Sequence, residues 1–458
     1  MRKQDFSYVY ALLGESTLGL MFILYVVIAR VVGPEKYGVF SAAVALGGIL
    51  GVCIQFGLPV LLTRSVAADP RQGSRHTLRF LLIQGFNTIP ILALLPLLTH
   101  WMGFSREGVV LCYLMIAAEL CRSMKMSWRS IMKGNSWFRM ESVSVFFERL
   151  FTVALAGIIL LTTGNLVLTT AALVLARLID NAGTGLYLGR RFPLAHSQQH
   201  EAWAQTYRRA LPFALHGLLW VVYYQVDIIM LKALAPEAEV GFYGAAYRVM
   251  EIFAALPRVV FYVAFTQFAK CHAEDPAKMP VHIFKALRML FLLILPCLII
   301  AGFIQPYAMP ILFGNAFLAS VGLLAVLLPG LGIKMFSTLS EEYLLATERE
   351  KQLPALLLIV SASNVLINIA LIPRFGAMGA AIATVASEAV FCCLGMLLLL
   401  RSPIRHTAVR IMLLILPCTA IAVAPSLHYA GLSILTTGTL LIASTAVLFL
   451  QMHRLSRP

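Results

Sequence analysis

The residues of this chain that could do chemistry are charged side chains embedded in apolar sequence. Asp227, Arg248, Glu251 and Arg258 lie in two apolar runs, joined by a short turn, within residues 226–258. An ionisable group in hydrocarbon is costly, so it commonly marks a functional site. Guanidinium groups suit an anion such as a phosphate, and buried carboxylates suit coupling to protons or sodium ions. This stretch is therefore the first candidate for a site.

Further charged residues lie deep in other apolar runs. The candidates for binding an anionic substrate are Arg248, Arg258, Arg30 and Lys334, and the candidates for ion coupling are Asp227, Glu251, Glu15 and Glu388. On a helix, Glu251 and Arg258 share one face and Arg248 lies near it, although Arg248 and Glu251 could equally form a structural ion pair. Two other combinations are set aside as structural pairs: Arg177 with Asp180, and Glu119 with Arg149.

The elements that must position these side chains are membrane-spanning helices. Of the 458 residues, 60% are hydrophobic and 12% are charged, whereas a soluble domain has about 25% charged residues. The long apolar runs do not alternate with a period of two, which predicts an all-α polytopic membrane protein rather than a β-barrel. The fourteen predicted spans are 8–32, 39–62, 78–100, 109–125, 143–162, 166–188, 211–234, 240–269, 284–308, 317–343, 354–372, 378–400, 411–425 and 432–451.

Basic residues alternate between the joins of these spans. Joins from an even-numbered to an odd-numbered span are rich in Lys and Arg, and the opposite joins are poor in them. The join after the fourth span, for example, holds Arg122, Lys125, Arg129, Lys133 and Arg139. The positive-inside rule then predicts that both termini are cytoplasmic. The rule also accounts for most of the net charge of +15 without a nucleic-acid partner.

The joins exclude several classes of protein. The longest, residues 189–210, is too short for a soluble domain, and no Gly-rich nucleotide-binding loop with a Lys occurs. The eight cysteines form no C-x-x-C pair and no Cys/His cluster with metal-ligand spacing. We therefore expect no enzyme activity, no metal and no cofactor other than a coupling H⁺ or Na⁺.

A short motif occurs twice and suggests an internal duplication. Residues 37–43, YGVFSAA, match residues 240–246, VGFYGAA, and each copy follows a Pro-Glu turn. A looser third copy covers residues 375–381. The first two copies lie six spans apart, which is an even number, so parallel repeats about an axis along the membrane normal are predicted. The predicted domains are a six-helix lobe (1–188), a cytoplasmic linker (189–210), a second six-helix lobe (211–400) and two additional helices (401–458).

Three stretches together resemble a known family. They are ARVVGPEKYGVFSAAVALGGILGVCIQFGLPVLLTRSVA at 29–67, Asp227 followed by VGFYGAAYRV at 240–249, and ILFGNAF at 311–317 with NVLINIALIPRFGAMGAAIATVASE at 364–388. In this order and spacing the chain resembles the polysaccharide-biosynthesis (O-antigen, Wzx-type) flippases. These belong to the multidrug/oligosaccharidyl-lipid/polysaccharide (MOP) exporter superfamily. The resemblance covers spans one to twelve and not the last two.

The resemblance implies a function as well as a fold. Such a protein would move oligosaccharide linked to undecaprenyl diphosphate from the inner to the outer leaflet of a bacterial cytoplasmic membrane, by alternating access in a cavity between two lobes. Arg248 and Arg258 would match the cationic cavity of the family, and a polysaccharide polymerase or co-polymerase would be a partner. The alternatives left open are a multidrug or cation antiporter of the same superfamily, a peptidoglycan-precursor flippase, and a membrane polysaccharide polymerase.

Overall fold

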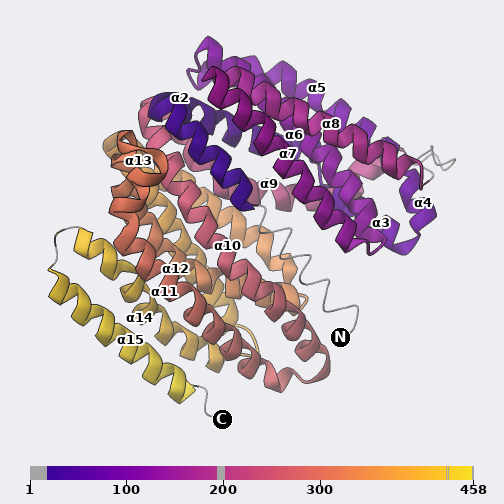
Figure 1. The fold of residues 1–458 in the computed structure, drawn as a ribbon. Coiled ribbons are helices and arrows are strands. Elements are labelled where there is room, and N and C mark those ends of the chain that lie inside the picture. Colours follow the sequence, from indigo (N-terminus) through magenta and orange to yellow (C-terminus); the bar gives the residue numbers. More distant parts are fainter. Residues whose placement is uncertain (1–17, 193–201, 430, 432, 456–458) are drawn as a thin grey trace. The chain divides into compact units, whose positions relative to one another are not determined.

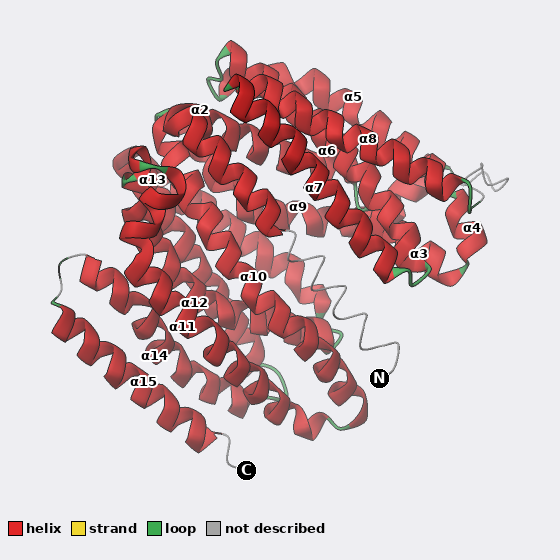
Figure 2. Cartoon of the chain, in the orientation of Figure 1, coloured by secondary structure: helices red, strands yellow, loops and turns green. Residues whose placement is uncertain are grey.

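A computed structural model describes residues 18–192, 202–429, 431 and 433–455. These residues form helices joined by short loops, and no strand occurs among them (Figure 2). The prediction of an all-α protein is confirmed. In hydrocarbon a helix satisfies every backbone polar group within its own segment, which is why a chain of this composition folds in this way.

The helices follow one another with little intervening chain (Figure 1). They are α2 (Leu18–Gln55), α3 (Leu58–Ala68), α4 (Pro70–Arg75), α5 (Thr77–Trp101), α6 (Arg106–Gly134), α7 (Phe138–Thr163), α8 (Leu166–Gly189), α9 (Trp203–Leu234), α10 (Glu237–Glu274), α11 (Met279–Phe313), α12 (Ala319–Ala346), α13 (Leu353–Leu400), α14 (Arg405–Tyr429) and α15 (Ile434–Leu455). Three single 3₁₀ turns, Pro276–Lys278, Asn315–Phe317 and Glu350–Gln352, precede α11, α12 and α13.

Two of these helices are hairpins that each contain two predicted spans. Gly33 interrupts α2 with a φ of 78°, and Gly376 interrupts α13 with a φ of 55°. The rings of Tyr25 and Phe40 lie 5.9 Å apart between centroids, whereas fifteen residues of straight helix would separate them by about 22 Å. Gly379 likewise packs against the backbone of Leu371. Glycine allows the positive φ at each reversal.

As far as the structure describes them, the fourteen predicted spans therefore fall on helices; residues 8–17 of the first span lie outside the described residues. Among the described residues, ten helices are long and apolar enough to cross a membrane, and α2 and α13 each supply two of the predicted spans. The eighth predicted span falls on α10 and the fourth on α6, which is longer and more polar than predicted. The protein is a multi-pass membrane protein.

The chain forms two compact units, Met1–Gly241 (unit 1) and Phe242–Pro458 (unit 2). Unit 1 contains α2 to α9 and the first residues of α10, and unit 2 contains the rest of α10 with α11 to α15. The repeat pattern assigns α9 to the second lobe, whereas in the structure α9 packs against α2 and α3. In unit 2, α12 is the most deeply buried helix and packs against α13 and α14.

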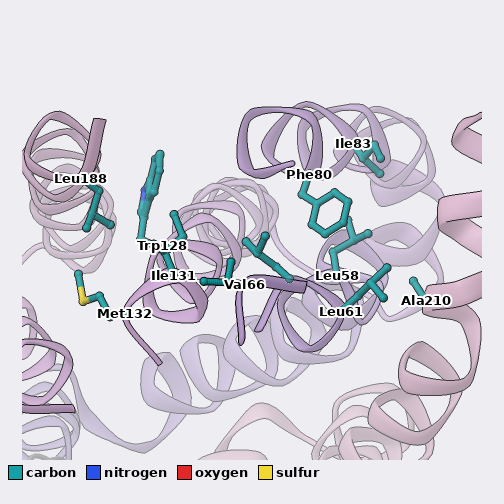
Figure 3. Packing of buried hydrophobic residues seen from close by; sticks show 11 residues of the cluster. Leu58, Leu61, Val66, Phe80, Ile83, Trp128, Ile131, Met132, Leu188 and Ala210 are labelled. Carbon is teal, nitrogen blue, oxygen red and sulfur yellow. The ribbon is translucent and has the colours of Figure 1, made fainter. Parts of the chain in front are cut away.

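One end of unit 1 is held together by an apolar cluster to which five helices contribute: α3, α5, α6, α8 and α9 (Figure 3). Its buried residues are Leu58, Leu61, Leu62, Val66, Phe80, Ile83, Trp128, Ile131, Met132, Leu188 and Ala210. They flank the joins after the second, fourth and sixth predicted spans. The joins that are rich in basic residues therefore meet at one end of unit 1, which we call the basic end.

The joins that are poor in basic residues meet elsewhere in unit 1. Lys232, near the end of α9, donates to the carbonyl of Gly103 at 3.1 Å and to Glu237 at 3.0 Å. The two copies of the repeated motif also touch here. A Cβ atom placed on Gly38 would lie 2.0 Å from the carbonyl oxygen of Glu237, and one placed on Gly241 would lie 2.0 Å from that of Pro34. Only glycine permits this approach of two backbones.

Candidate functional site

The predicted site residues are distributed over both units. Unit 1 holds Arg30 on α2 and Asp227 on α9, and unit 2 holds Arg248, Glu251 and Arg258 on α10, Lys334 on α12 and Glu388 on α13. Glu15 and the side chain of Arg258 lie outside the described part of the structure. The other side chains fall into three kinds: an enclosed pair, an open pair, and two residues that belong to neither.

The enclosed pair joins Lys334 to Glu388. Its members come from neighbouring helices, α12 and α13, and both residues are buried. Lys334 Nζ donates to one carboxylate oxygen of Glu388, and the hydroxyl of Ser337 lies 3.4 Å from the other. Because the two charges neutralise each other, this arrangement is permitted in a low-dielectric interior.

The open pair joins Arg248 to Glu251 within α10. A guanidinium nitrogen of Arg248 donates to a carboxylate oxygen of Glu251 at 2.7 Å, and the side chain of Glu251 is 34% exposed. This confirms the i,i+3 pairing that the sequence permits. The side chain of Arg248 is 13% exposed and has a further partner besides Glu251.

Arg30 and Asp227 are in opposite environments. Asp227 is only 2% exposed on α9, and Arg30 is exposed near the end of the first half of α2. Arg30 is next to the Gly33 reversal, so its position is fixed by the hairpin of α2. The coupling role of Asp227 and the substrate-binding role of Arg30 stay predictions.

Unit 1 also contains a buried charge network that the sequence only partly anticipates. Glu119 on α6 pairs with Arg122 one turn later, and it lies 3.9 Å from Arg177 on α8. Arg177 also donates to the carbonyl of Ala118 at 3.0 Å. Gly47 and Gly51 of α2 pack directly on Glu119, so the absence of side chains on one helix makes room for the carboxylate on another.

The predicted pairing of Arg177 with Asp180 is wrong. Asp180 instead accepts a hydrogen bond from Lys125 at 2.6 Å, and Lys125 also donates to Ser144 at 2.8 Å and to Thr184 at 2.9 Å. Residues three apart on a helix are neighbours, but the facing helix can offer a closer partner. Lys125 thus links three helices, α6, α7 and α8.

The assignment of Lys125 to a basic join is also wrong. The helix α6 continues to Gly134, and Lys125 is 2% exposed inside unit 1. Further along α6, Arg129 and Lys133 both face Glu141 of α7. The basic residues 122, 125, 129 and 133 recur every three or four positions, which is the period of a helix face, and that signal predicts a longer helix.

Other chemistry is not indicated by the described residues. No group of three or more His, Cys, Asp or Glu side chains within 18–192, 202–429, 431 and 433–455 could hold a metal ion. All eight cysteines are free thiols and most are buried. Outside the helices, the pKa of Asp275 is lowered from its ordinary value, chiefly by a hydrogen bond from Lys278.

Known proteins resemble this chain over most of its length. The family described as "Polysaccharide biosynthesis protein" matches residues 7–266. A Shigella flexneri protein described as an O-antigen transporter is 22% identical over 321 residues, which cover 66% of this chain and 75% of that protein.

Solved structures share the fold. An inward-facing multidrug resistance MATE family transporter of the MOP superfamily superposes with a TM-score of 0.69, at 16% identity, over 87% of this chain and 98% of that one. The lipid II flippase MurJ, in an inward closed conformation, superposes with a TM-score of 0.68, at 16% identity, over 98% of each chain. The predicted fold of a MOP-type transporter is therefore confirmed.

Proposed function

Because the chain belongs to the family of polysaccharide biosynthesis proteins, we propose that it carries undecaprenyl-diphosphate-linked oligosaccharide repeat units from the inner to the outer leaflet of a bacterial cytoplasmic membrane. The family match over more than half of the chain is the observation that carries this proposal. The product would feed the export of a polysaccharide such as O-antigen, capsule or exopolysaccharide. A polymerase or co-polymerase would act on the delivered units.

The charged residues support a division of labour within the proposed transport. The cations that we assign to the diphosphate and the attached glycan are Arg248, Arg258 and Arg30, whereas Lys334 is held by Glu388 inside unit 2. Arg248 is the best supported, because its partner Glu251 is 34% exposed and a guanidinium can form forked contacts to a phosphate. The carboxylates that we assign to coupling with H⁺ or Na⁺ are Asp227, Glu251 and Glu15, and Asp227 has the burial that such a role needs.

The orientation that we propose puts the basic end of unit 1 and both termini in the cytoplasm. Alternating access would then carry the substrate away from the basic end. The fold is shared by an exporter of drugs and by a lipid II flippase, so the fold alone does not choose between these classes. The family match favours an anionic lipid-linked substrate, which is moved without any covalent step.

The test is to locate the lipid-linked repeat units in cells that lack this protein. Undecaprenyl-linked glycans are extracted from spheroplasts after treatment with a sugar-modifying reagent that does not cross the membrane. We expect intact repeat units to accumulate unmodified, because they remain on the inner leaflet. Modified repeat units that reach the outer leaflet but stay unpolymerised would instead indicate a polymerase. No change in either pool would indicate an exporter of other compounds.

A further inference from the structure

A cavity of about 530 Å³ opens at the basic end of unit 1. The end of α3, the segment around α4 and the first turns of α9 form its walls, and Arg64, Asp69, His76, Arg209 and Phe213 line it. Two of these, Asp69 and His76, flank α4 in the join between the second and third predicted spans. The cavity therefore lies where the membrane-spanning helices end, which is the level of lipid headgroups.

The cavity is rich in basic side chains. Arg64, Arg209 and His76 line it together with one carboxylate, Asp69. Arg209, His76 and Asp69 each have a further partner, so Arg64 is the cation that is best placed to meet a ligand. The guanidinium carbon of Arg64 lies 4.7 Å from the centre of the Phe213 ring. Stacking uses the face of the guanidinium, whereas its N–H donors point outward in the plane. Within the part of the chain that the structure describes, no carboxylate pairs with Arg64, so these donors face the cavity mouth and its solvent.

Apolar residues of the cavity itself point to an amphiphilic ligand. Leu61 on α3 and Pro212 and Phe213 on α9 line the cavity beside the arginines. A free phosphate would make no contact with these apolar side chains that stabilises its binding. A lipid uses both parts, with its phosphate among the arginines and its chains along the helices.

We propose that this cavity binds the phosphate headgroup of a membrane lipid on the basic side of the membrane. Two sources have this chemistry: an ordinary anionic phospholipid, and the polyprenyl diphosphate carrier of the proposed substrate. The second source rests on the proposed function and would make the cavity an entry site that captures the carrier before translocation. The first source does not depend on the proposed function.

The experiment measures lipid binding to the purified full-length protein by native mass spectrometry. The probes are phosphatidylglycerol, undecaprenyl diphosphate and diacylglycerol, which has no phosphate. The variant Arg64→Gln/Arg209→Gln is compared with Arg190→Gln, because Arg190 is exposed at the same end but does not line the cavity. We expect the double variant to lose about tenfold or more in affinity for a phosphate-bearing lipid, while Arg190→Gln and diacylglycerol binding stay unchanged.

The outcomes separate the sources and the proposals. Loss confined to undecaprenyl diphosphate assigns the cavity to the carrier, and loss that includes phosphatidylglycerol assigns it to phospholipid headgroups. Equal binding by wild type and the double variant, or an equal loss in Arg190→Gln, overturns the inference. Arg64→Lys/Arg209→Lys keeps the charge without the forked contact, so an intermediate affinity is expected even if the glutamine variant folds poorly. Because binding is measured without transport, failure of the leaflet experiment would leave this result intact.

Discussion

Two ion pairs in unit 2 differ in how far the protein covers them. The side chains of Lys334 and Glu388 are 8% and 3% exposed and come from two helices, whereas those of Arg248 and Glu251 are 13% and 34% exposed and come from one helix. An enclosed pair has lost most of its hydration, so removal of one charge leaves the other charge buried without a counter-charge. In an open pair, replacing one member by a substrate group or an ion costs little free energy, because an exposed ion pair contributes little.

The comparison teaches that burial, rather than residue type, separates structural from available charges here. By sequence, Lys334 and Arg248 are both cations inside apolar runs. In the structure, Lys334 pairs with a buried carboxylate on another helix, and Arg248 pairs with the more exposed Glu251 on its own helix. Four substitutions test this distinction, ordered by the expected loss of stability.

The largest loss is expected for Lys334→Met. The substitution leaves the carboxylate of Glu388 buried without its partner, which should lower the free energy of unfolding by about 3–5 kcal/mol. Denaturant unfolding of the purified protein in mixed micelles measures the change. Lys334→Met/Glu388→Gln removes both charges and should recover most of the loss. If the double variant were as unstable as the single variant, packing rather than charge would explain the effect.

A smaller loss is expected for Lys125→Met in unit 1. Lys125 is as buried as Lys334, but its partner Asp180 is 15% exposed, so the orphaned carboxylate could recover some hydration. We expect a loss of roughly 2–3 kcal/mol. Lys133→Met on the same helix is the matched control, because its side chain is 45% exposed and 3.7 Å from Glu141. Equal losses in the two variants would contradict the role given to burial.

Little loss of stability is expected for Arg248→Gln. An open pair within a helix contributes about 0.5 kcal/mol, so the unfolding curve should barely move. Transport of lipid-linked repeat units should nevertheless fall about tenfold or more, because a charged contact to the diphosphate is removed. Arg248→Lys should retain part of the activity, since it keeps the charge but not the fork. Wild-type transport by Arg248→Gln would remove Arg248 from the site.

The smallest effect is expected for Lys278→Met, which breaks a pair at the surface. The hydrogen bond from Lys278 lowers the pKa of Asp275 in the folded protein. The pair therefore stabilises the fold at any pH above the ordinary pKa of an aspartate carboxyl group. This stabilisation is lost as the pH falls through the lowered pKa of Asp275. The unfolding midpoints of variant and wild type should therefore differ slightly at neutral pH and converge below about pH 4. A difference that grew on acidification would contradict this sign.

The sequence predicts the helices well because each follows from a long apolar run. The reversals at Gly33 and Gly376 also fall between predicted spans. Gly33 directly follows the first span, and Gly376 lies two positions before the twelfth. The charge pairs are predicted less well. Lys334 and Glu388 receive separate roles from the sequence, although they contact each other across α12 and α13.

The missed contacts share one physical reason. A helical period tells which residues share a face of one helix, but it does not tell which face of another helix meets them. Arg177 and Asp180 illustrate this, since each pairs with a residue of α6 rather than with its neighbour on α8. Lys125 was missed because a polar helix face resembles a basic loop unless its period is examined.

The contact of the two repeated motifs has the form of a two-fold interface inside one chain. Pro34 and Glu237 are the same number of positions apart as Gly38 and Gly241, so they are equivalent residues of the two copies. Gly38 of the first copy packs against the carbonyl of Glu237, and Gly241 of the second copy packs in the same way against the carbonyl of Pro34. Reciprocity of this kind defines the isologous contact of a symmetric homodimer. The motif is thus complementary to itself, and a half-length chain that carried one copy could form the same contact with a second molecule of itself.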